Sequence, residues 1–272
     1  MQEEMTIGFI GAGNMAAALS KGLLASGRAE PERMCASDVD EKRRKQYARA
    51  TSAEVFADNA AVARRSDVVI IAVKPQQMEE VLSGMGTALE ERHLIISIAA
   101  GITTAFVEKF IRNGVRVIRA MPNTPMLVGA GAVGLCKGKW ATDADLDLAR
   151  SIFESSAVVV TVEEDDMDAV TALSGSGPAY FFYLAEAMIR AGTELGLTDE
   201  NASALALQTA FGAGKMLAES DECPEELRRR VTSPGGTTEA AIKCMQEAHV
   251  AESVVEAIKA AARRSKELGE QK

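Results

Sequence analysis

The chain has 272 residues, of which 47% are hydrophobic and 25% are charged, a composition typical of a folded globular protein. This length suits one large domain or two domains of ordinary size. The formal net charge of −9 argues against a general nucleic-acid binder, because contact with phosphate backbones needs a basic surface. A small anion would need a local electropositive site rather than the field of the whole protein.

The N-terminal segment MQEEMTIGFIGAG is acidic and then apolar for only a few residues, unlike a secretion signal or a transit peptide. No stretch reaches the roughly 18 uninterrupted apolar residues that a membrane helix needs. The four cysteines are far apart and form no CxxC pair, which argues against a zinc cluster or a disulfide framework. They are Cys35, Cys136, Cys223 and Cys244. We therefore expect buried or incidental thiols, no metal, no membrane partner and a cytoplasmic location.

Short apolar runs alternate with helix-like segments over residues 1–164. Several runs are continuous rather than alternating, as expected for strands that helices cover on both faces. This rhythm predicts an α/β fold with a doubly wound, mainly parallel sheet, and the last two runs add strands at its far edge. The runs cover residues 5–11, 32–37, 53–57, 67–73, 93–99, 115–121, 131–136 and 157–162.

A glycine motif lies directly between the first predicted strand and the first predicted helix. Gly11, Gly13 and Ala16 in GFIGAGNMA match the G-x-G-x-x-G/A pattern. In that pattern the first glycine permits a tight turn, the second lets a diphosphate approach the backbone, and the third position allows close helix packing. A tight strand–helix turn without a ligand would look similar. The repeated strand–helix units favour dinucleotide binding.

The end of the second predicted strand carries mixed signals about the dinucleotide. Asp38 is placed to accept hydrogen bonds from the adenosine ribose, which favours NAD(H). Ser37, Lys42, Arg43 and Arg44 could instead hold the 2′-phosphate of NADP(H). Ordinary helix capping would also explain this segment. The residues alone leave the choice between the two cofactors open.

Three later strand ends should share the same edge of the sheet, where ligands of open parallel sheets bind. Lys74 follows the fourth strand, where it could attract an anion, line the cofactor or simply be solvated. SIAAG (97–101) and MPNTP (121–125) form small, backbone-rich loops beside which a nicotinamide could lie.

Strand-like runs vanish after Glu164, and Ala, Leu, Met and Glu dominate the remaining sequence. PAYFFYLAEAMIRAGTELGL has Pro178 suited to the first helical turn and Gly196 suited to a stop. This helix is apolar nearly all round, so we expect it to be buried against another subunit. We therefore predict an α/β domain over residues 1–164 and an all-helical domain over residues 165–272.

The segment SPGGTT introduces a predicted helix near the C-terminus. Gly235 and Gly236 leave the next backbone N–H groups unobstructed, and Thr237 and Thr238 add two hydroxyls. The free amides of a helix start concentrate partial positive charge, which suits a carboxylate and contributes on the order of 0.3–2 kcal/mol. An elaborate helix cap with a Ser or Thr is the equal alternative.

Taken in order, GFIGAGNM, AVKP, SIAAG, MPNTP, the EED…DAVTALSGSGPAY stretch and VTSPGGTT resemble the pyrroline-5-carboxylate reductase family over essentially the whole chain. The last two segments are specific to that family. The resemblance implies a Rossmann domain followed by a helical dimerisation domain, with active sites at the dimer interface and dimers often assembled into decamers. It implies NAD(P)H-dependent reduction of the cyclic imine of 1-pyrroline-5-carboxylate to L-proline, the last step of proline synthesis.

The resemblance also implies site residues, and one position departs from the usual pattern. Many relatives carry a small hydroxyl or an Asn that tolerates a 2′-phosphate where this chain has Asp38, which speaks against a strict NADPH preference. The implied cofactor site comprises Ile10, Gly11, Ala12, Gly13, Asn14, Met15, Ser37, Asp38, Asn59, Ala72, Val73, Lys74, Ala100 and Asn123. The implied substrate site comprises Glu164, Ser233, Gly235, Gly236, Thr237 and Thr238, with Thr238 as the catalytic residue that hydrogen-bonds the ring nitrogen.

The expected chemistry needs no strong general acid. The two histidines, His93 and His249, lie at a strand start and in a helix junction, where neither is well placed to donate a proton. A cyclic imine can arrive protonated, so the protein mainly aligns the nicotinamide with the imine carbon and excludes water.

Two rival functions are possible for a chain of this kind. The β-hydroxyacid dehydrogenases use a catalytic lysine early in their helical domain, whereas this chain has no lysine between Lys139 and Lys215. A non-catalytic NAD(P) sensor would need the first half of the chain but no substrate cradle at SPGGTT.

Overall fold

The structure, a computed structural model, describes residues 5–270, which fold into two compact units. The first unit contains the described residues up to Ser176 together with those from Ala261 onward. The second unit contains Gly177–Ala260. We describe each unit by itself.

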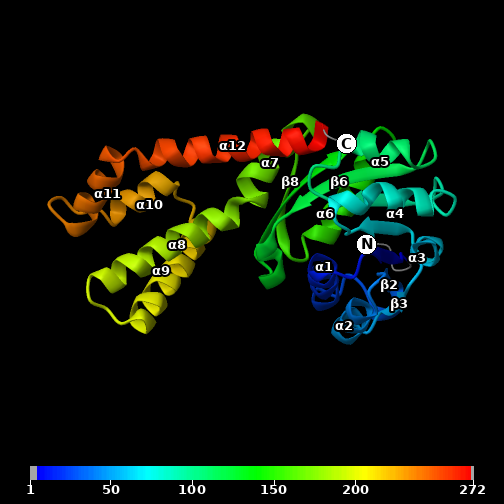
Figure 1. The fold of residues 1–272 in the computed structure, drawn as a ribbon, viewed down its shortest axis with the longest axis horizontal. Helices are drawn as coiled ribbons and strands as arrows, with labels where there is room; N and C mark the ends of the chain where they lie inside the picture. Colours follow the sequence, from blue (N-terminus) through cyan, green and yellow to red (C-terminus); the bar gives the residue numbers. More distant parts are fainter. Residues whose placement is uncertain (1–4, 271–272) are drawn as a thin grey trace. The chain divides into compact units, whose positions relative to one another are not determined.

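The first unit contains one eight-stranded sheet with the order β3-β2-β1-β4-β5-β6-β7-β8. Every neighbouring pair is parallel except β6 with β7, which is antiparallel. All eight predicted runs form strands, and the predicted doubly wound sheet is confirmed (Figure 1). The strands are β1 (Ile7–Ile10), β2 (Met34–Ser37), β3 (Glu54–Phe56), β4 (Val68–Ile71), β5 (Leu94–Ser97), β6 (Arg116–Pro122), β7 (Gly131–Lys137) and β8 (Ala157–Thr161).

Helices cover both faces of this sheet, so its central strands are buried on both sides. One apolar cluster joins the sheet to α1 (Asn14–Ala25), α2 (Glu41–Thr51) and α6 (Asp143–Phe153). A second cluster on the other face joins it to α3 (Asn59–Arg65), α4 (Met78–Met85) and α5 (Thr104–Lys109). Full burial of a large apolar side chain contributes about 1.5–3 kcal/mol, which explains why the strand sequences are continuous apolar runs rather than alternating ones.

The strand order places several loops at one edge of the sheet. β1 lies between β2 and β4, so the chain winds one way through β2 and β3 and the other way through β4 and β5. In open parallel sheets, ligands bind beyond the carboxyl ends of the strands where this reversal occurs. The loops that follow β1, β2, β4 and β5 therefore form the expected dinucleotide edge. The 3₁₀ turn η2 (Pro75–Gln77) lies in the loop after β4, whereas η1 (Pro31–Arg33) precedes β2 and η3 (Thr124–Val128) follows β6.

The glycine-rich LSGSG stretch is helical rather than a bend. A 3₁₀ turn η4 (Glu164–Asp166) leads into α7 (Met167–Val170) and then into the π-helical turn η5 (Thr171–Gly175). The Ser174 hydroxyl donates to the carbonyl of Val170 at 2.9 Å, so it bonds within the helix instead of capping a new one. π-Helical turns of this kind occur frequently at functional sites.

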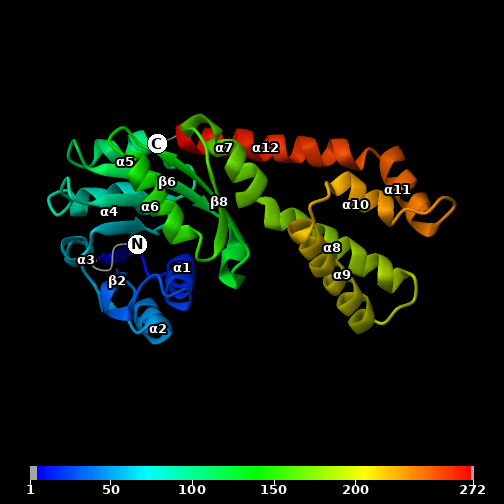
Figure 2. The same ribbon diagram turned by 180° about the vertical axis from the view of Figure 1, so that it is seen from behind.

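The second unit is entirely helical over its described residues. It contains α8 (Gly177–Glu194), α9 (Asp199–Glu219), α10 (Pro224–Arg230), α11 (Thr237–Glu247) and the start of α12 (Val250–Glu270). Helices α8 and α9 lie side by side as a hairpin in both views (Figures 1 and 2). Their approach needs Gly192, because a Cβ there would lie 2.9 Å from the Cβ of Ala202. Pro178 lies in the first turn of α8, as predicted. Gly196, with φ of +96°, follows the end of this helix, which agrees with the predicted stop.

Large apolar side chains of α8 are exposed in the single chain. Phe181, Phe182 and Tyr183 are 65%, 63% and 76% exposed. Among the described residues of α8, only Gly177 and Ala185 are buried. The predicted burial of this helix is therefore not met within one chain. Its burial against another subunit stays a prediction.

The predicted boundary between residues 164 and 165 stays a prediction. The compact units divide at Ser176, and the last turns of α12 belong to the first unit. There the Ser265 hydroxyl donates to Asp168 Oδ1 at 2.6 Å.

All four cysteines are free thiols, two of them buried and two exposed. Within residues 5–270, no helix combines the length and apolarity needed to span a bilayer.

Candidate active site

The loop after β1 is held tightly against the neighbouring strand ends. Gly11 has φ of +97°, and a Cβ there would lie 2.7 Å from the carbonyl oxygen of Ala72. Its N–H donates to the carbonyl of Ser37 at 2.8 Å, and the Ala72 N–H donates to the carbonyl of Ile10, also at 2.8 Å. A side chain at Gly11 would be strained and would also collide with the backbone. The first glycine of the motif therefore has the structural role that the sequence predicts.

The entrance of α1 has no side chain over it. Gly13 is the N-cap residue, no side chain of residues 5–270 caps the helix, and its first turn contains no acidic residue. A Cβ on Gly13 would meet no atom within 4 Å. By contrast, Asp40 caps α2 and Asp58 caps α3 through their carboxylates. The amides at the start of α1, from Asn14 and Met15, are therefore available for an anion such as a diphosphate.

Asp38 links the second strand to the glycine loop. Its side chain is buried, and its carboxylate accepts from the Ala12 N–H at 3.0 Å and from the Asp40 N–H at 2.9 Å. An ionised carboxylate has about four acceptor sites, so two remain for other donors such as ribose hydroxyls. The Arg43 guanidinium lies 3.8 Å from the same carboxylate. The predicted ribose contact of Asp38 is compatible with this geometry and stays a prediction.

Two of the residues considered for a 2′-phosphate are engaged elsewhere. Ser37 is fully buried, and its hydroxyl donates to Asn59 Oδ1 at 2.8 Å. Arg44 donates to the carbonyls of Asp38 and Val39 at 2.6 and 3.2 Å. Of the predicted phosphate ligands, Arg43 and Lys42 remain exposed at the surface.

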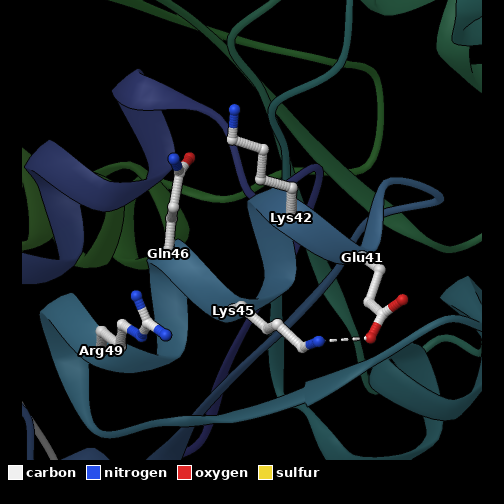
Figure 3. Close-up of a pocket in the computed structure, with 5 residues that line it drawn as sticks. All are labelled: Glu41, Lys42, Lys45, Gln46 and Arg49. Carbon is white, nitrogen blue, oxygen red and sulfur yellow. Dashed lines mark ion pairs between the residues drawn. The ribbon is translucent and has the colours of Figure 1, made fainter.

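Lys42 lines a shallow cavity of about 360 Å³ along the outer side of α2 (Figure 3). In this view Lys45 points towards Glu41, with which it forms an ion pair at 2.6 Å, whereas Lys42 points away from the pair. The other lining residues are Gln46 and Arg49. None of the residues that the resemblance implies for the cofactor or substrate site lines this cavity.

The remaining predicted cofactor residues lie after β4, β5 and β6. Val73 and Lys74 follow β4, and Ala100 lies in the loop between β5 and α5. Asn123 follows β6 and is buried, and both ends of its side-chain amide are bonded. Its Nδ2 donates to the carbonyl of Ser174 at 3.1 Å, and its Oδ1 accepts from the Ala132 N–H at 2.9 Å. Asn123 thus ties the π-helical turn to β7.

Glu164, predicted to lie near the substrate, is held inside the first unit. Its Oε2 accepts from the N–H of Thr104 at 3.2 Å and from the Thr104 hydroxyl at 2.7 Å. Its Oε1 pairs with the buried guanidinium of Arg119. Burial alone would raise the pKa of Glu164, but the bonds from Thr104 and Arg119 outweigh it, so the pKa lies below its ordinary value. The substrate contact of Glu164 stays a prediction.

The entrance of α11 carries the predicted substrate cradle. Gly236 is the N-cap residue without a side-chain cap, and Thr237 and Thr238 are the first two helical residues. Gly235 has φ of +72°, and a Cβ on Gly236 would lie 2.5 Å from the Ser233 hydroxyl. The loop geometry therefore requires both glycines. The uncapped amides at the start of α11 can bind a carboxylate.

A side chain of the helix itself already reaches this entrance. Glu239 Oε2 accepts from the N–H of Gly235 at 2.7 Å. Glu239, Gly235 and Gly236 line an open cavity of about 620 Å³ together with Lys243 and other residues of α11. An anionic ligand at the Gly235 amide would have to displace the Glu239 carboxylate.

The structure thus gathers the predicted residues into two groups. The cofactor residues and Glu164 belong to the first unit, and Ser233 to Thr238 belong to the second. Sequence reasoning missed Thr104, Arg119 and Glu239. Arg119 had a recognisable signal, because a charge within a buried strand needs a partner. No comparable sequence pattern indicated the contacts of Thr104 or of Glu239.

Comparison with known families agrees with both units. Residues 164–268 match the family described as pyrroline-5-carboxylate reductase dimerisation. Residues 6–101 match the family described as NADP oxidoreductase, coenzyme F420-dependent.

Individual relatives match over nearly the whole chain. A pyrroline-5-carboxylate reductase of Pseudomonas aeruginosa is 46% identical over 97% of this chain and 97% of its own length. A solved pyrroline-5-carboxylate reductase of Coxiella burnetii is 40% identical with a TM-score of 0.92, covering 98% of this chain and 99% of its own. That of Plasmodium falciparum, solved with NADP bound, is 31% identical with a TM-score of 0.87, covering 99% and 100%. The chain therefore belongs to the pyrroline-5-carboxylate reductase family.

Proposed function

We propose that the protein reduces the cyclic imine of 1-pyrroline-5-carboxylate to L-proline with a hydride from NADPH or NADH. Similarity to reductases of this name over 97% of the chain carries the proposal. The two glycine-led helix entrances support it, because they supply amides for the two anionic groups that such a reaction brings together.

The first unit suits a dinucleotide. Backbone amides from Ile10 to Met15 would hold the diphosphate, because the space over Gly13 is open and α1 is uncapped. Ser37 and Asp38 would lie at the adenosine ribose. The ends of β4 and β5, with Val73, would line the nicotinamide half. Ala72, Lys74, Asn59, Ala100 and Asn123 complete the proposed cofactor site. When bound, the cofactor supplies the hydride.

The second unit suits the substrate carboxylate. The amides of Gly236, Thr237 and Thr238 would bind it, with Ser233 and Gly235 shaping the loop. Thr238 would hydrogen-bond the ring nitrogen and keep its own proton, its hydroxyl donating to the nitrogen of a neutral imine or sharing the proton that a protonated nitrogen already carries. The hydride forms a C–H bond at the imine carbon, the C=N π electrons move to nitrogen, and the product is a secondary amine.

The chain's residues therefore act chiefly by binding and orientation. A protonated imine is already electrophilic, so holding the carboxylate and ring nitrogen fixes the carbon that accepts the hydride. His93 Nε2 lies 3.0 Å from the carbonyl of Ala63, and its Nδ1 lies 2.8 Å from the Glu90 N–H, so both ring nitrogens are engaged. This agrees with a mechanism that uses no histidine as acid.

The protein would work as a homo-oligomer. The match to a dimerisation family over residues 164–268 supports this assembly. The exposed aromatic side chains of α8 also support it, because burying them against another subunit would remove apolar surface from water. We propose a homodimer as the basic unit, with a decamer as a possible higher assembly. Four free thiols suit a reducing compartment, and we place the protein in the cytoplasm.

Steady-state kinetics test this function. Protein, 1-pyrroline-5-carboxylate and NADPH or NADH should lose absorbance at the reduced-nicotinamide band and form L-proline in equal amount. A flat trace with both cofactors, from protein that still binds them, would favour a sensor and contradict the proposal. Conversion of a β-hydroxyacid instead would favour the dehydrogenase rival, which the missing lysine between Lys139 and Lys215 opposes.

A further inference from the structure

One carboxylate, that of Glu164, joins four separate elements of the first unit. It begins η4 and contacts Thr104 at the start of α5, Arg119 in β6 and Cys136 in β7. Thr104 contributes two hydrogen bonds to Oε2, at 3.2 Å from its N–H and 2.7 Å from its hydroxyl. The Cys136 thiol is a third donor to the same oxygen, at 3.5 Å. Both carboxylate oxygens are therefore engaged within the unit.

Sheet register explains why these side chains meet. Arg119 pairs with Ser97 of β5 on one side and with Cys136 of β7 on the other, so all three side chains lie on one face. Arg119 is 4% exposed, and Glu164 supplies the opposite charge. Burial, followed by the negative charge of Glu164, raises the pKa of Cys136 to about 12, so this thiol keeps its proton and can donate it.

The hydrogen bonds to Thr104 fix one end of a short loop. This loop, residues 98–103, connects β5 to α5 and contains Ala100, which we place at the nicotinamide. On its other side the loop contacts the end of α12, since a Cβ on Gly101 would lie 3.7 Å from the Leu268 Cβ. The loop is thus held between α12 and Glu164. Loss of the Glu164 bonds would release its α5 end.

We propose that Glu164 is a positioning residue, which holds the loop of residues 98–103 through Thr104. Its negative charge opposes direct contact with the carboxylate of the substrate, and its contacts with Thr104 and Arg119 lie within the unit. The proposal rests on the function given above, because the loop matters through the nicotinamide that it lines. A direct-contact role for Glu164 is the alternative that an experiment must separate.

Thr104→Val provides the sharpest variant. It removes the 2.7 Å hydroxyl bond while keeping the N–H bond and the shape of the side chain. Thr51→Val is the matched control, because Thr51 is equally buried and loses a 2.8 Å bond to the carbonyl of Tyr47 in α2. A loosened loop should lower kcat about tenfold in Thr104→Val, since small misplacements at a reacting centre have large effects. KM for the substrate and Kd for L-proline should stay within about twofold.

Three further measurements complete the test. Hydrogen exchange of residues 98–104 should speed up about tenfold in Thr104→Val and in Glu164→Gln but not in Thr51→Val. Thr104→Ser, which restores the hydroxyl, should recover kcat. Combining Thr104→Val with Glu164→Gln should add less than the sum of the two single losses, because both changes weaken the same contact.

The outcomes separate this proposal from the proposed function. If wild type fails to reduce the imine, the proposed function fails, while hydrogen exchange still decides whether Glu164 holds the loop. If Glu164→Gln weakens L-proline binding more than tenfold while Thr104→Val behaves like wild type in kcat and exchange, Glu164 touches the substrate and the proposal is wrong. Should Glu164→Gln not fold, the pair Thr104→Val and Thr104→Ser decides alone.

Discussion

The entrances of α1 and α11 begin alike and differ in what occupies them. Both have an extended glycine at the N-cap, Gly13 and Gly236, and neither has a side-chain cap. The space over Gly13 is open, and α1 has no acid in its first turn. At α11, Glu239 accepts from the Gly235 N–H at 2.7 Å. No side chain of the described residues therefore occupies the start of α1, whereas at α11 a carboxylate of the helix itself bonds the loop that leads into it.

A third entrance, that of α5, shows the opposite extreme. There Glu164 bonds the first amide from inside the unit, paired with the buried Arg119. Glu164 is half-buried and paired with a buried guanidinium, whereas the carboxylate of Glu239 is exposed and has no such partner among the described residues.

The largest effect, on cofactor affinity, should come from filling the open space over Gly13 at the start of α1. Gly13→Val places methyl groups in a space where nothing else lies, so the fold should be kept while diphosphate binding is blocked. Loss of two hydrogen bonds to a charged group, about 1.5–3 kcal/mol each, predicts a fall in NADP⁺ affinity of about 100-fold or more. Isothermal titration calorimetry measures it. Gly84→Val, also into open space, is the control and should leave the affinity unchanged.

The next effect concerns the hydroxyl at the α11 entrance. Thr238→Ala should lower kcat/KM by roughly ten- to a thousandfold, as expected for the loss of one donor in a polar site. Thr238→Ser keeps the donor and should recover most of the activity. Near-wild-type turnover by the alanine variant would remove Thr238 from the mechanism.

A smaller effect, a gain in substrate affinity, should follow from removing the Glu239 carboxylate, which accepts from the Gly235 N–H. Glu239→Gln eliminates the negative charge beside the Gly235 amide, so KM for the substrate should fall about two- to tenfold, the range of one modest hydrogen bond. Glu247→Gln, which removes a charge from the exposed far end of the same helix, is the control. An unchanged or higher KM in Glu239→Gln would mean that Glu239 does not compete with the substrate.

The smallest effect is the pH dependence of the half-buried Glu164 carboxylate at the start of α5. The pKa of Glu164 lies below its ordinary value of 4.5, so its contribution to stability is full above that pH and is lost as pH falls through the folded-state pKa. At pH 7, Glu164→Gln should lower Tm by about 2–4 °C. The difference from wild type should shrink below about pH 4.5. A difference that does not change with pH would show that the charge of Glu164 does not stabilise the fold.

Much of the first unit can be predicted from sequence because its signals are local. Continuous apolar runs followed by helical periodicity predicted all eight strands, and the spacing of Gly11 and Gly13 predicted the loop after β1. No such local signal indicates the π-helical turn over Thr171–Gly175. The small residues of this stretch permit a π-helical turn. The Ser174 carbonyl in that turn accepts a hydrogen bond from the side chain of Asn123, which is distant in the sequence.

The contacts of Glu164 could not be predicted, because its partners are far away in the sequence. Thr104 and Arg119 precede it by 60 and 45 residues. Only sheet register brings them together, and no local pattern encodes register between distant strands. Likewise, the apolar residues of α8 indicated burial, but in the described part of the chain only Gly177 and Ala185 of this helix are buried.

A crystal structure with L-proline and NADP⁺ tests the central claim most directly. We predict that the proline carboxylate accepts hydrogen bonds from the amides around Gly236, Thr237 and Thr238, next to the Gly235 amide that Glu239 bonds. We also predict the ring nitrogen within hydrogen-bonding distance of the Thr238 hydroxyl. Proline bound away from residues 233–238 would contradict the assignment of the substrate to this helix entrance.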